Sequence, residues 1–284
     1  MNDAGNREAS RQQWGDSAEA WARAAEEEET GASASATKWM LEAAELQPGD
    51  QVLEIACGAG RVGLQAAEVI GPAGMVLCSD FAESMAQAVR DRVVRAGIAN
   101  VKTRVLDAES LDLEAESSDV VLCRFGYMLM ADPYRALSES CRVLRPGGRL
   151  VLAVWDRAGR NPWLSTIFDA TMNQLDAAPP QPGAPGPFAL GDTAHLRQML
   201  EGTGLIGIDV IEIEAEQTYD SLEGWWEQIR AVSGPLAALL DALPPPDAEA
   251  VREAALGAAQ RYVESSGEVV FPASIVGAQA RRPA

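Results

Sequence analysis

The chain has 284 residues, of which 47% are hydrophobic, and its mean hydropathy is -0.08, as expected of a globular protein with a sizeable core. Its formal net charge of -19 at pH 7 disfavours nucleic acids and anionic membranes as partners, because both are polyanions that attract basic surfaces. No segment reaches the roughly 20 apolar residues that cross a bilayer, and the polar beginning of the chain contains no apolar signal-peptide region. These features predict a cytoplasmic protein without a membrane partner.

Three residue types are scarce enough to limit the chemistry. The four cysteines show no C-x-x-C spacing and fall in predicted buried strands or helices: Cys57, Cys78, Cys123 and Cys141. They are predicted to be small core residues in a reducing compartment. The only lysines are Lys38 and Lys102, and the only histidine is His195. No cluster of carboxylates and histidine has the spacing of metal ligands, so no metal site is predicted.

The first half of the chain alternates short apolar strands with helices. Residues 10–46 are predicted to be helical. Strands are predicted at 51–57, 75–80, 101–107, 118–125 and 147–155, with helices at 62–70, 82–97 and 133–144. This alternation favours a parallel, doubly wound sheet, whose ligand is expected beyond the carboxyl ends of the strands, near the first crossover.

The rhythm changes after residue 156. Residues 157–192 are predicted to be a connector, in which the Pro/Gly-rich stretch AAPPQPGAPGPF forms no regular structure. A helix (193–203), a strand (206–216), a mostly helical segment (221–265) and a closing strand within 267–282 are predicted to follow. The fold class is therefore α/β, with a Rossmann-like, doubly wound, seven-stranded, mostly parallel sheet and helical lid insertions.

We divide this single predicted domain into four segments by the changes in pattern. They are an N-terminal helical cap (1–46), a cofactor-binding core (47–156), a lid or connector (157–205), and C-terminal strands with a helical insertion (206–284). The insertions are the natural place for substrate selection, because loops on a rigid scaffold carry specificity.

A glycine-rich loop follows the first predicted strand in LEIACGAGRVG, residues 53–63. Its glycines satisfy the dinucleotide pattern G-x-G-x-x-G, and Asp80 stands 20 residues after Gly60, where a carboxylate can hold ribose hydroxyls. Glycines there let the backbone press against a ligand at a helix N-terminus. This pattern alone leaves NAD, FAD and other adenosine cofactors open.

Three features weigh against a dinucleotide. Glu54 precedes the loop, where a carboxylate favours a bound ammonium group and repels a pyrophosphate. The acidic stretch 107–109 ends the third strand and can take an adenine amino group. Neither Lys38 nor Lys102 has a tyrosine four residues before it, so the Tyr-x-x-x-Lys pair of short-chain dehydrogenases is missing.

A family resemblance is carried by five segments in order: VLEIACGAG, SDFAESM, LDAESL, SDVVLCRFGYMLMADPYRALSESCRVLRPGGRLVLAVW and, overlapping its end, LVLAVWDRAGRNPW. The chain resembles class I S-adenosylmethionine-dependent methyltransferases, and within them the ubiquinone/menaquinone-biosynthesis type that acts on small molecules. The likeness is close over about residues 35–160. One departure is Ala56, where the family has the first glycine of its loop, and a local shift of the backbone is expected there.

The resemblance implies a role for each matching residue. Those assigned to the methionine part of the cofactor are Glu54, Ala56, Cys57, Gly58 and Gly60. Asp80 is expected to bind both ribose hydroxyls, with Phe81 and Met85 against the adenine, although ordinary packing at a helix start explains these two equally well. Asp107 and Ala108 are expected at the adenine edge, and Arg124 with Phe125 near the methyl donor.

A general base is needed only if the acceptor arrives protonated and weakly acidic. Tyr127, just beyond the fourth strand, and His195, in the first turn of a helix, are the candidates, each with packing or helix capping as the plainer interpretation. A set of aromatic residues at the end of strand five and in the lid segments could enclose an apolar or aromatic substrate: Trp14, Trp21, Trp39, Trp155, Trp163, Phe168, Trp225 and Trp226. Burial of the lid helices accounts for many of them equally well.

The resulting hypothesis is a cytoplasmic, S-adenosylmethionine-dependent methyltransferase of a small, apolar or aromatic molecule, with O-, N- or C-methylation open. One alternative is a non-catalytic or regulatory protein that binds the same cofactor, because a fold does not guarantee an activity. A second is an NAD-dependent oxidoreductase, and a third is a protein that binds the cofactor for chemistry other than methylation. The sequence does not indicate the oligomeric state.

Overall fold

The computed structural model describes residues 3–26, 30–176 and 183–284. Seven strands form one sheet: β1 (Gln51–Ile55), β2 (Met75–Asp80), β3 (Val101–Val105), β4 (Ser118–Arg124), β5 (Leu144–Trp155), β6 (Ile206–Tyr219) and β7 (Val269–Arg281). Their order is β3-β2-β1-β4-β5-β7-β6, and β7 alone runs opposite to the other six strands. The predicted seven-stranded, mostly parallel sheet is confirmed.

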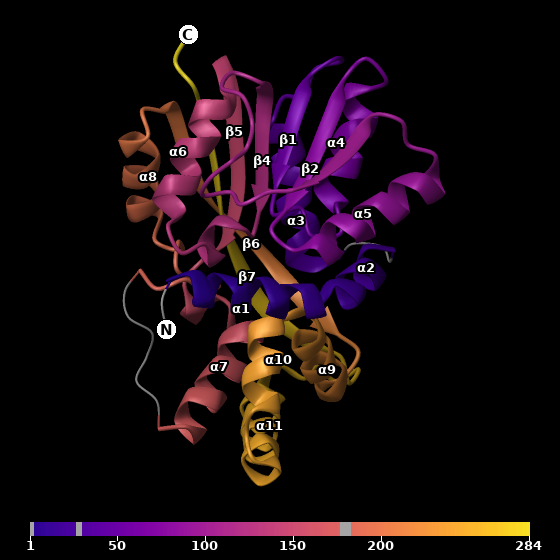
Figure 1. Cartoon of the computed structure of the whole chain (residues 1–284). Helices are drawn as coiled ribbons and strands as arrows, with labels where there is room; N and C mark the ends of the chain where they lie inside the picture. Colours follow the sequence, from indigo (N-terminus) through magenta and orange to yellow (C-terminus); the bar gives the residue numbers. More distant parts are fainter. Residues whose placement is uncertain (1–2, 27–29, 177–182) are drawn as a thin grey trace.

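Two groups of helices cover the sheet. One face carries α3 (Gly31–Ala43), α4 (Arg61–Ile70) and α5 (Glu83–Ala96), and the other carries α6 (Pro133–Val143) and α8 (Thr193–Gly202). This division follows from right-handed crossovers, which place helices on opposite faces once the strand order reverses beside β1. The reversal puts the carboxyl ends of β1 and β4 side by side (Figure 1).

A helical cap extends beyond the carboxyl ends of the parallel strands (Figure 1). It consists of α7 (Pro162–Gln174), α9 (Leu222–Val232), α10 (Gly234–Asp241) and α11 (Pro245–Ala259). Helix α7 packs on α11, so the cap is assembled from two segments far apart in the sequence. Short 3-10 turns, η1 (Tyr127–Leu129), η2 (Ala158–Arg160) and η3 (Gln260–Tyr262), complete the connections.

The first two helices lie between the core and this cap. Helix α1 (Asp3–Asp16) contacts α5 and α10, and α2 (Ala18–Glu26) contacts α5 and α9 (Figure 1). The side chain of Ser84 donates to the Gly15 carbonyl oxygen at 3.0 Å, and the Trp21 indole donates to the Val232 carbonyl oxygen at 3.0 Å. The N-terminal helices thereby connect α5, where adenine contacts are predicted, to the cap.

The predicted connector at 157–192 is wrong in one respect, because α7 occupies 13 of its residues. Most of the residues from Pro162 to Thr171 are buried, and polar Ser165 and Thr166 are among them, so polar residues do not mark a solvent-facing stripe as they do in a surface helix. Pro162 at its start is compatible with a helix, since the first turn needs no backbone N–H donor. In the Pro/Gly-rich stretch, residues 177–182 lie outside the described part of the chain, and 183–188 form no helix or strand.

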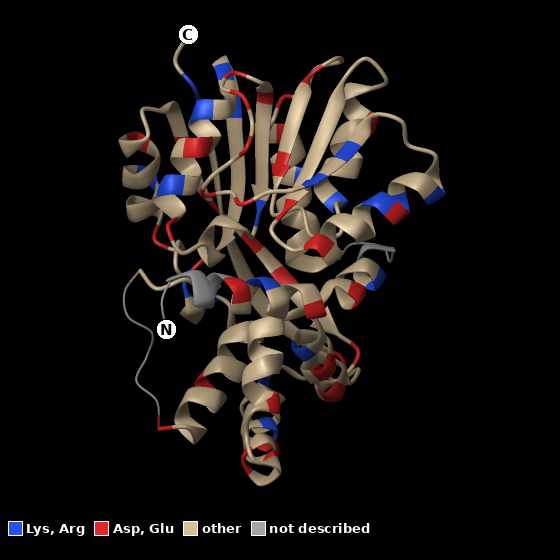
Figure 2. Ribbon diagram, viewed as in Figure 1, with Lys and Arg blue, Asp and Glu red and all other residues tan. Residues whose placement is uncertain are grey.

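The excess of negative charge is spread over the molecule. Acidic residues occur on the core helices, on the edge strand β6 and on the cap alike (Figure 2). Within the described residues, no helix is both long and apolar enough to cross a lipid bilayer.

Candidate functional site

Three residues of the loop between β1 and α4 have positive φ angles, and only two of the three are glycines. Ala56, Gly58 and Gly60 adopt positive φ angles of 51°, 52° and 76°. A Cβ atom at Gly60 would lie 2.9 Å from Val89 Cγ2, and one at Gly63 would lie 2.3 Å from Glu54 Oε2. Glycine is therefore required at Gly60 by conformation and contact, and at Gly63 by close packing of helix on strand. Ala56 adopts a left-handed conformation that favours glycine.

Glu54 lies beneath this loop, in the interior of the protein. Its side chain is 2% exposed, and its Oε2 accepts hydrogen bonds from the backbone N–H of Gly63 at 3.0 Å and from the Cys78 thiol at 3.4 Å. Burial raises the pKa of the Glu54 carboxyl to about 7, although Cys78, Arg124 and the Gly63 N–H oppose the shift. The carboxyl group thus stabilises the first turn of α4 and can gain or lose a proton near neutral pH.

Asp80, the last residue of β2, joins the same loop. Its Oδ2 accepts from the backbone N–H of Gly58 at 2.9 Å, and its Oδ1 accepts from that of Ala82 at 3.0 Å. Burial raises the pKa of Asp80, and these backbone hydrogen bonds work against the increase. Each carboxylate oxygen can accept more than one hydrogen bond, so Asp80 can brace the loop and still receive ribose hydroxyls.

The residues predicted to contact adenine lie around the start of α5 and the end of β3. Met85 is buried in a small cluster with Ala18 and Ala82, which Trp14 and Trp21 of the N-terminal helices cover. Those helices therefore take up much of the Met85 surface.

Phe81 and Asp107 lie nearer the surface than Met85. The Arg11 guanidinium lies 4.3 Å from the centre of the Phe81 ring. Asp107 accepts from the Glu109 backbone N–H at 2.9 Å, which fixes the turn that contains Ala108.

The end of β4 meets the glycine-rich loop directly. A Cβ atom at Gly126 would lie 2.6 Å from Ala56 Cβ, so the two backbones are in close contact. Arg124 donates to Thr37 Oγ1 at 2.6 Å and to the Ser33 carbonyl oxygen at 3.3 Å, which fixes its guanidinium against α3. The sequence alone gave no indication of this support from α3.

Phe125 continues the site toward the cap. Its φ angle is 59°, and its ring stacks on Trp155 at 4.0 Å between centroids, with 9° between the planes. Trp155 in turn meets Trp163 of α7 edge to face at 4.8 Å. A bulky residue held at positive φ is strained, and such strain is concentrated at functional sites. An aromatic wall thus runs from the Ala56–Gly126 contact into α7.

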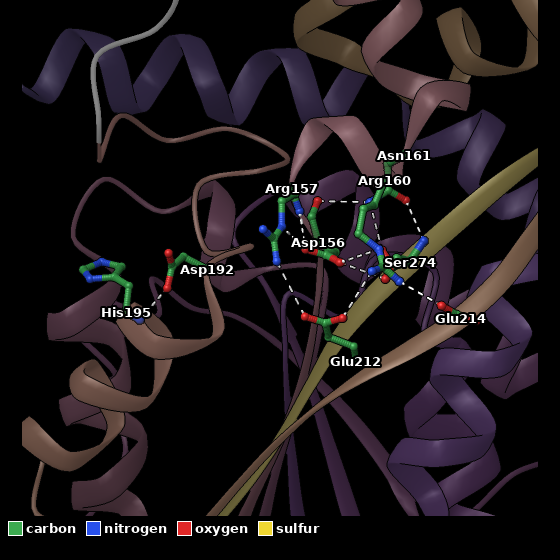
Figure 3. A network of polar contacts seen from close by, with 9 residues as sticks. All are labelled: Asp156, Arg157, Arg160, Asn161, Asp192, His195, Glu212, Glu214 and Ser274. Atoms are coloured by element: carbon green, nitrogen blue, oxygen red, sulfur yellow. Dashed lines mark hydrogen bonds and ion pairs between the residues drawn. The ribbon is translucent and has the colours of Figure 1, made fainter.

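The two candidate bases lie in different surroundings. Tyr127 is fully buried, and its hydroxyl is 2.6 Å from the Ser140 hydroxyl of α6. Burial raises the pKa of this phenol well above its usual range, which opposes ionisation. His195 is exposed in the first turn of α8, where Asp192 caps the helix by accepting from the His195 backbone N–H at 2.9 Å (Figure 3). Its imidazole points away from the Asp156 cluster drawn beside it (Figure 3).

That cluster, which the sequence did not suggest, joins β5 to the cap (Figure 3). Asp156 is fully buried, and its Oδ2 accepts from the Ser274 hydroxyl of β7 at 2.9 Å and lies 3.2 Å from Arg160 Nε. The buried Asn161 side chain donates to the carbonyl oxygens of Asp156 and Ser274 at 3.0 and 2.9 Å. Asp156 follows the end of β5 much as Asp80 ends β2, so the same sequence signal marks both residues. The side-chain partners of Asp156, Ser274 and Arg160, belong to the protein itself.

The loop and its carboxylates fit one class of ligand better than another. S-adenosylmethionine carries a sulfonium, an ammonium, a carboxylate and two ribose hydroxyls. Asp80 suits its ribose hydroxyls and the Arg124 guanidinium suits its carboxylate, whereas the buried Glu54 supports the loop that faces the ligand. The Glu54 carboxyl group buried under the loop disfavours a pyrophosphate. Among the described residues, no group of three or more His, Cys, Asp or Glu side chains could hold a metal ion.

Known proteins resemble this chain in sequence. Residues 52–148 match a family described as a methyltransferase domain. Over 133 residues the chain is 36% identical to the ubiquinone/menaquinone biosynthesis C-methyltransferase of Ectopseudomonas mendocina (strain ymp), an alignment that covers 46% of this chain and 52% of that protein. The chain thus spans about half the length of the curated relatives it matches.

The structural likeness extends over most of the chain. The YcgJ protein from Bacillus subtilis superposes with a TM-score of 0.60 at 18% identity, covering 88% of this chain and 98% of that one. The [4+2]-cyclase SpnF superposes with a TM-score of 0.51 at 21% identity, covering 87% of this chain and 79% of that one. Residues 52–148 therefore resemble a methyltransferase domain in sequence, and most of the chain shares the fold of these solved structures.

Proposed function

We propose that this protein binds S-adenosylmethionine at the loop between β1 and α4 and transfers its methyl group to a small, uncharged, apolar or aromatic molecule. The observation that carries the proposal is the convergence of the strained loop, the Asp80 carboxylate and the end of β4 at one point, the Ala56–Gly126 contact. Methyl transfer needs the cofactor and the acceptor in contact, and this convergence of loop, carboxylate and strand end supports placing both there.

We keep for the site residues the roles expected from the sequence. The methionine part of the cofactor is assigned to Glu54, Ala56, Cys57, Gly58 and Gly60, and Arg124 with Phe125 is assigned to the surroundings of the methyl donor. Asp80 receives the ribose hydroxyls, and the groups assigned to adenine are Phe81, Met85, Asp107 and Ala108. Of these, Glu54 acts through the loop that it stabilises, since its Oε2 already accepts from Gly63 and Cys78.

The chemistry is an in-line displacement. When bound, S-adenosylmethionine supplies a methyl group on a positively charged sulfur, which leaves as a neutral thioether as the acceptor atom bonds to the methyl carbon. The protein aligns the acceptor and excludes water, and such positioning accounts for several kcal/mol of barrier lowering in enzymes. The stacked Phe125 and Trp155 rings offer an apolar surface beside the reacting atoms.

An acceptor that arrives protonated also needs a place for its proton. Of the two candidates, His195 is accessible to solvent. Burial raises the pKa of the Tyr127 phenol, so this group can act as a base only if its ionised form is stabilised. We therefore favour His195, or solvent, for a weakly acidic acceptor.

The setting of the reaction follows from composition. Four free cysteines fit a reducing compartment, which supports a cytoplasmic location. The net charge of -19 disfavours nucleic acid as the acceptor.

Calorimetric titration with S-adenosylmethionine, S-adenosylhomocysteine and NAD tests the proposal. Saturable binding of the first two without binding of NAD is expected, followed by methyl transfer to a member of an acceptor panel. Binding of NAD alone would favour an oxidoreductase. Cofactor binding with no transfer to any acceptor would favour the non-catalytic alternative.

The ribose assignment has its own test. Asp80→Asn keeps one oxygen for the Gly58 N–H but loses the charge and turns its NH2 group toward the Ala82 N–H, and we expect at least about a tenfold loss of S-adenosylmethionine affinity. Asp91→Ala, on the exposed face of α5, is the matched control. Equal affinities of the two variants would contradict the assignment.

A further inference from the structure

Helix α3 provides a buried hydrogen-bonding group for Arg124, the last residue of β4. Thr37 of this helix is 2% exposed, and its hydroxyl donates to the Ser33 carbonyl oxygen at 3.0 Å. That bond uses the single hydrogen of the hydroxyl, so its lone pairs accept from Arg124 Nη1, at 2.6 Å. The same Nη1 donates to the Ser33 carbonyl oxygen at 3.3 Å. Thr37 thus offers Arg124 an acceptor in one fixed direction.

The position of α3 is itself fixed by the strands of the sheet. The helix contacts β4, β5, β6 and β7. In its first turn, the backbone N–H of Ala32 donates to Gln217 Oε1 of β6 at 3.0 Å. Toward its end, a Cβ atom at Gly277 of β7 would lie 2.7 Å from the Trp39 ring, so helix and strand are in close contact. The support of Arg124 is therefore rigid, because α3 is held near both of its ends.

Arg124 lies where β4 meets the proposed cofactor site. Two residues further along the chain, a Cβ atom at Gly126 would lie 2.6 Å from Ala56 Cβ of the glycine-rich loop. Burial raises the pKa of Glu54 beneath that loop, and the positive charge of Arg124 is among the influences that oppose the increase. The Arg124 guanidinium also lies 5.7 Å from the centre of the Phe125 ring. Its charge therefore acts both on the loop and on the first ring of the aromatic wall.

Two other arginines lie at the α4 end of the glycine-rich loop. Arg92 of α5 donates to the Ala59 carbonyl oxygen, and Arg61, the first residue of α4, donates to the Ala24 carbonyl oxygen of α2. Arg124 approaches instead from β4, at the Ala56 end of the loop, beside the place proposed for the methyl donor.

The methionine part of S-adenosylmethionine ends in a carboxylate and an ammonium group. A guanidinium binds a carboxylate through parallel hydrogen bonds from two of its nitrogens, so the orientation of its plane decides the strength of binding. Both contacts of Arg124 with Thr37 and Ser33 involve Nη1, and they set the orientation of the whole planar group. A side chain that is already held in place also loses less conformational entropy when a ligand binds.

We infer that Thr37 is a positioning residue, which holds the Arg124 guanidinium in the orientation that binds the carboxylate of S-adenosylmethionine. The inference rests on the proposed function, and it adds the group that anchors the methionine part of the cofactor and the helix that orients this group. Thr37 acts on the cofactor only through Arg124.

The test compares two ligands by calorimetric titration of the full chain. S-adenosylhomocysteine carries the carboxylate, and decarboxylated S-adenosylhomocysteine keeps the ammonium group and the thioether but lacks the carboxylate. We expect the wild type to bind S-adenosylhomocysteine at least about tenfold more tightly than the decarboxylated ligand. In Thr37→Val, which keeps the shape of the side chain without its acceptor, this preference should fall to about threefold or less. Thr37→Ser retains the hydroxyl and should keep the wild-type preference.

A matched control separates this role from the loss of any buried threonine hydroxyl. Thr171 of α7 is fully buried, and its hydroxyl donates to the Ile167 carbonyl oxygen at 2.8 Å, four residues earlier, as that of Thr37 does to Ser33. Thr171→Val should therefore leave the Kd values of both ligands unchanged.

A double-mutant cycle tests whether Thr37 acts through Arg124. Arg124→Met should abolish the preference for S-adenosylhomocysteine, and adding Thr37→Val should then change the Kd by less than about twofold. Independent, multiplying effects of the two substitutions would contradict the inference.

The remaining outcomes are distinct. Equal affinity of the wild type for the two ligands overturns the carboxylate assignment. A wild-type preference that persists in Thr37→Val, including an equal loss of affinity for both ligands, overturns the positioning role. Failure of the wild type to bind S-adenosylhomocysteine at all instead overturns the proposed function.

Discussion

Ala56 shows how a single residue can depart from a family pattern at a measurable cost. It adopts a φ of 51°, and the left-handed region costs a residue with a Cβ roughly 1–2 kcal/mol. The sequence predicted a local shift of the backbone at this position. The structure shows instead that the backbone keeps the left-handed conformation that favours glycine, so the alanine is strained.

Ala56→Gly is therefore expected to increase the free energy of unfolding by about 0.5–1 kcal/mol, after the greater freedom of glycine in the unfolded chain is subtracted. Urea denaturation of the two proteins measures the difference. Ala254→Gly, at an exposed site in α11, is the control of opposite sign, with an expected loss of about 0.5–1 kcal/mol. A destabilised Ala56→Gly variant would show that the alanine is not strained.

Glu54 links stability to pH at the same loop. Its pKa is about 7 in the folded protein against 4.5 ordinarily, so the folded state favours the protonated form. Ionisation therefore penalises folding: the penalty is absent below about pH 4.5, develops as pH rises to about 7, and is complete above that.

The variant Glu54→Gln keeps an oxygen for the Gly63 N–H and removes the titration. Between pH 5 and 8 we expect the wild type to lose about 2 kcal/mol of unfolding free energy relative to Glu54→Gln. If urea denaturation gave the same change in unfolding free energy between pH 5 and 8 for both proteins, the raised pKa of Glu54 would be contradicted.

At the scale of elements, the connection between β5 and α7 is stabilised by the buried carboxylate of Asp156. Asp156→Ala would leave the Ser274 hydroxyl without its acceptor and Arg160 without its buried counter-charge, and we expect a loss of about 3 kcal/mol of unfolding free energy. Asp169→Ala, at an exposed position of α7, should change stability by less than about 0.5 kcal/mol. Chemical denaturation distinguishes the two, and a similar effect of both substitutions would remove Asp156 from this role.

The parallel sheet and its flanking helices could be predicted because each element carries its own signal, such as the apolar run before Asp80 or the helical spacing after Met85. The loop between β1 and α4 was equally readable, since its glycines stand in sequence order. Helix α7 was missed because its burial on several sides erases the polar stripe. The support of Arg124 by Thr37, and the contact of Gly126 with Ala56, join residues far apart in the chain, and no local pattern encodes them.

At the scale of the whole molecule, charge repulsion is the dominant electrostatic feature. There are 42 acidic and 23 basic residues, and many of the ion pairs are exposed, where each contributes little. Salt screens repulsion over the whole surface, so raising sodium chloride from about 0.05 to 0.5 M is expected to increase Tm by a few degrees at pH 7.5. Near the isoelectric pH of 4.4 the increase should vanish. A Tm that falls with salt at pH 7.5 would mean that the ion pairs outweigh the repulsion.

The strand order has a consequence for how the chain matures on the ribosome. β7 lies between β5 and β6, so β6 has no partner in the sheet until residues 269–281 have been made. While the cap helices α9 to α11 are being synthesised, both edges of β6 therefore lack a partner strand. Its glutamates at 212, 214 and 216 hinder pairing with another nascent chain in that interval. The charge on this strand thus protects the protein at the stage of synthesis when its sheet is still incomplete.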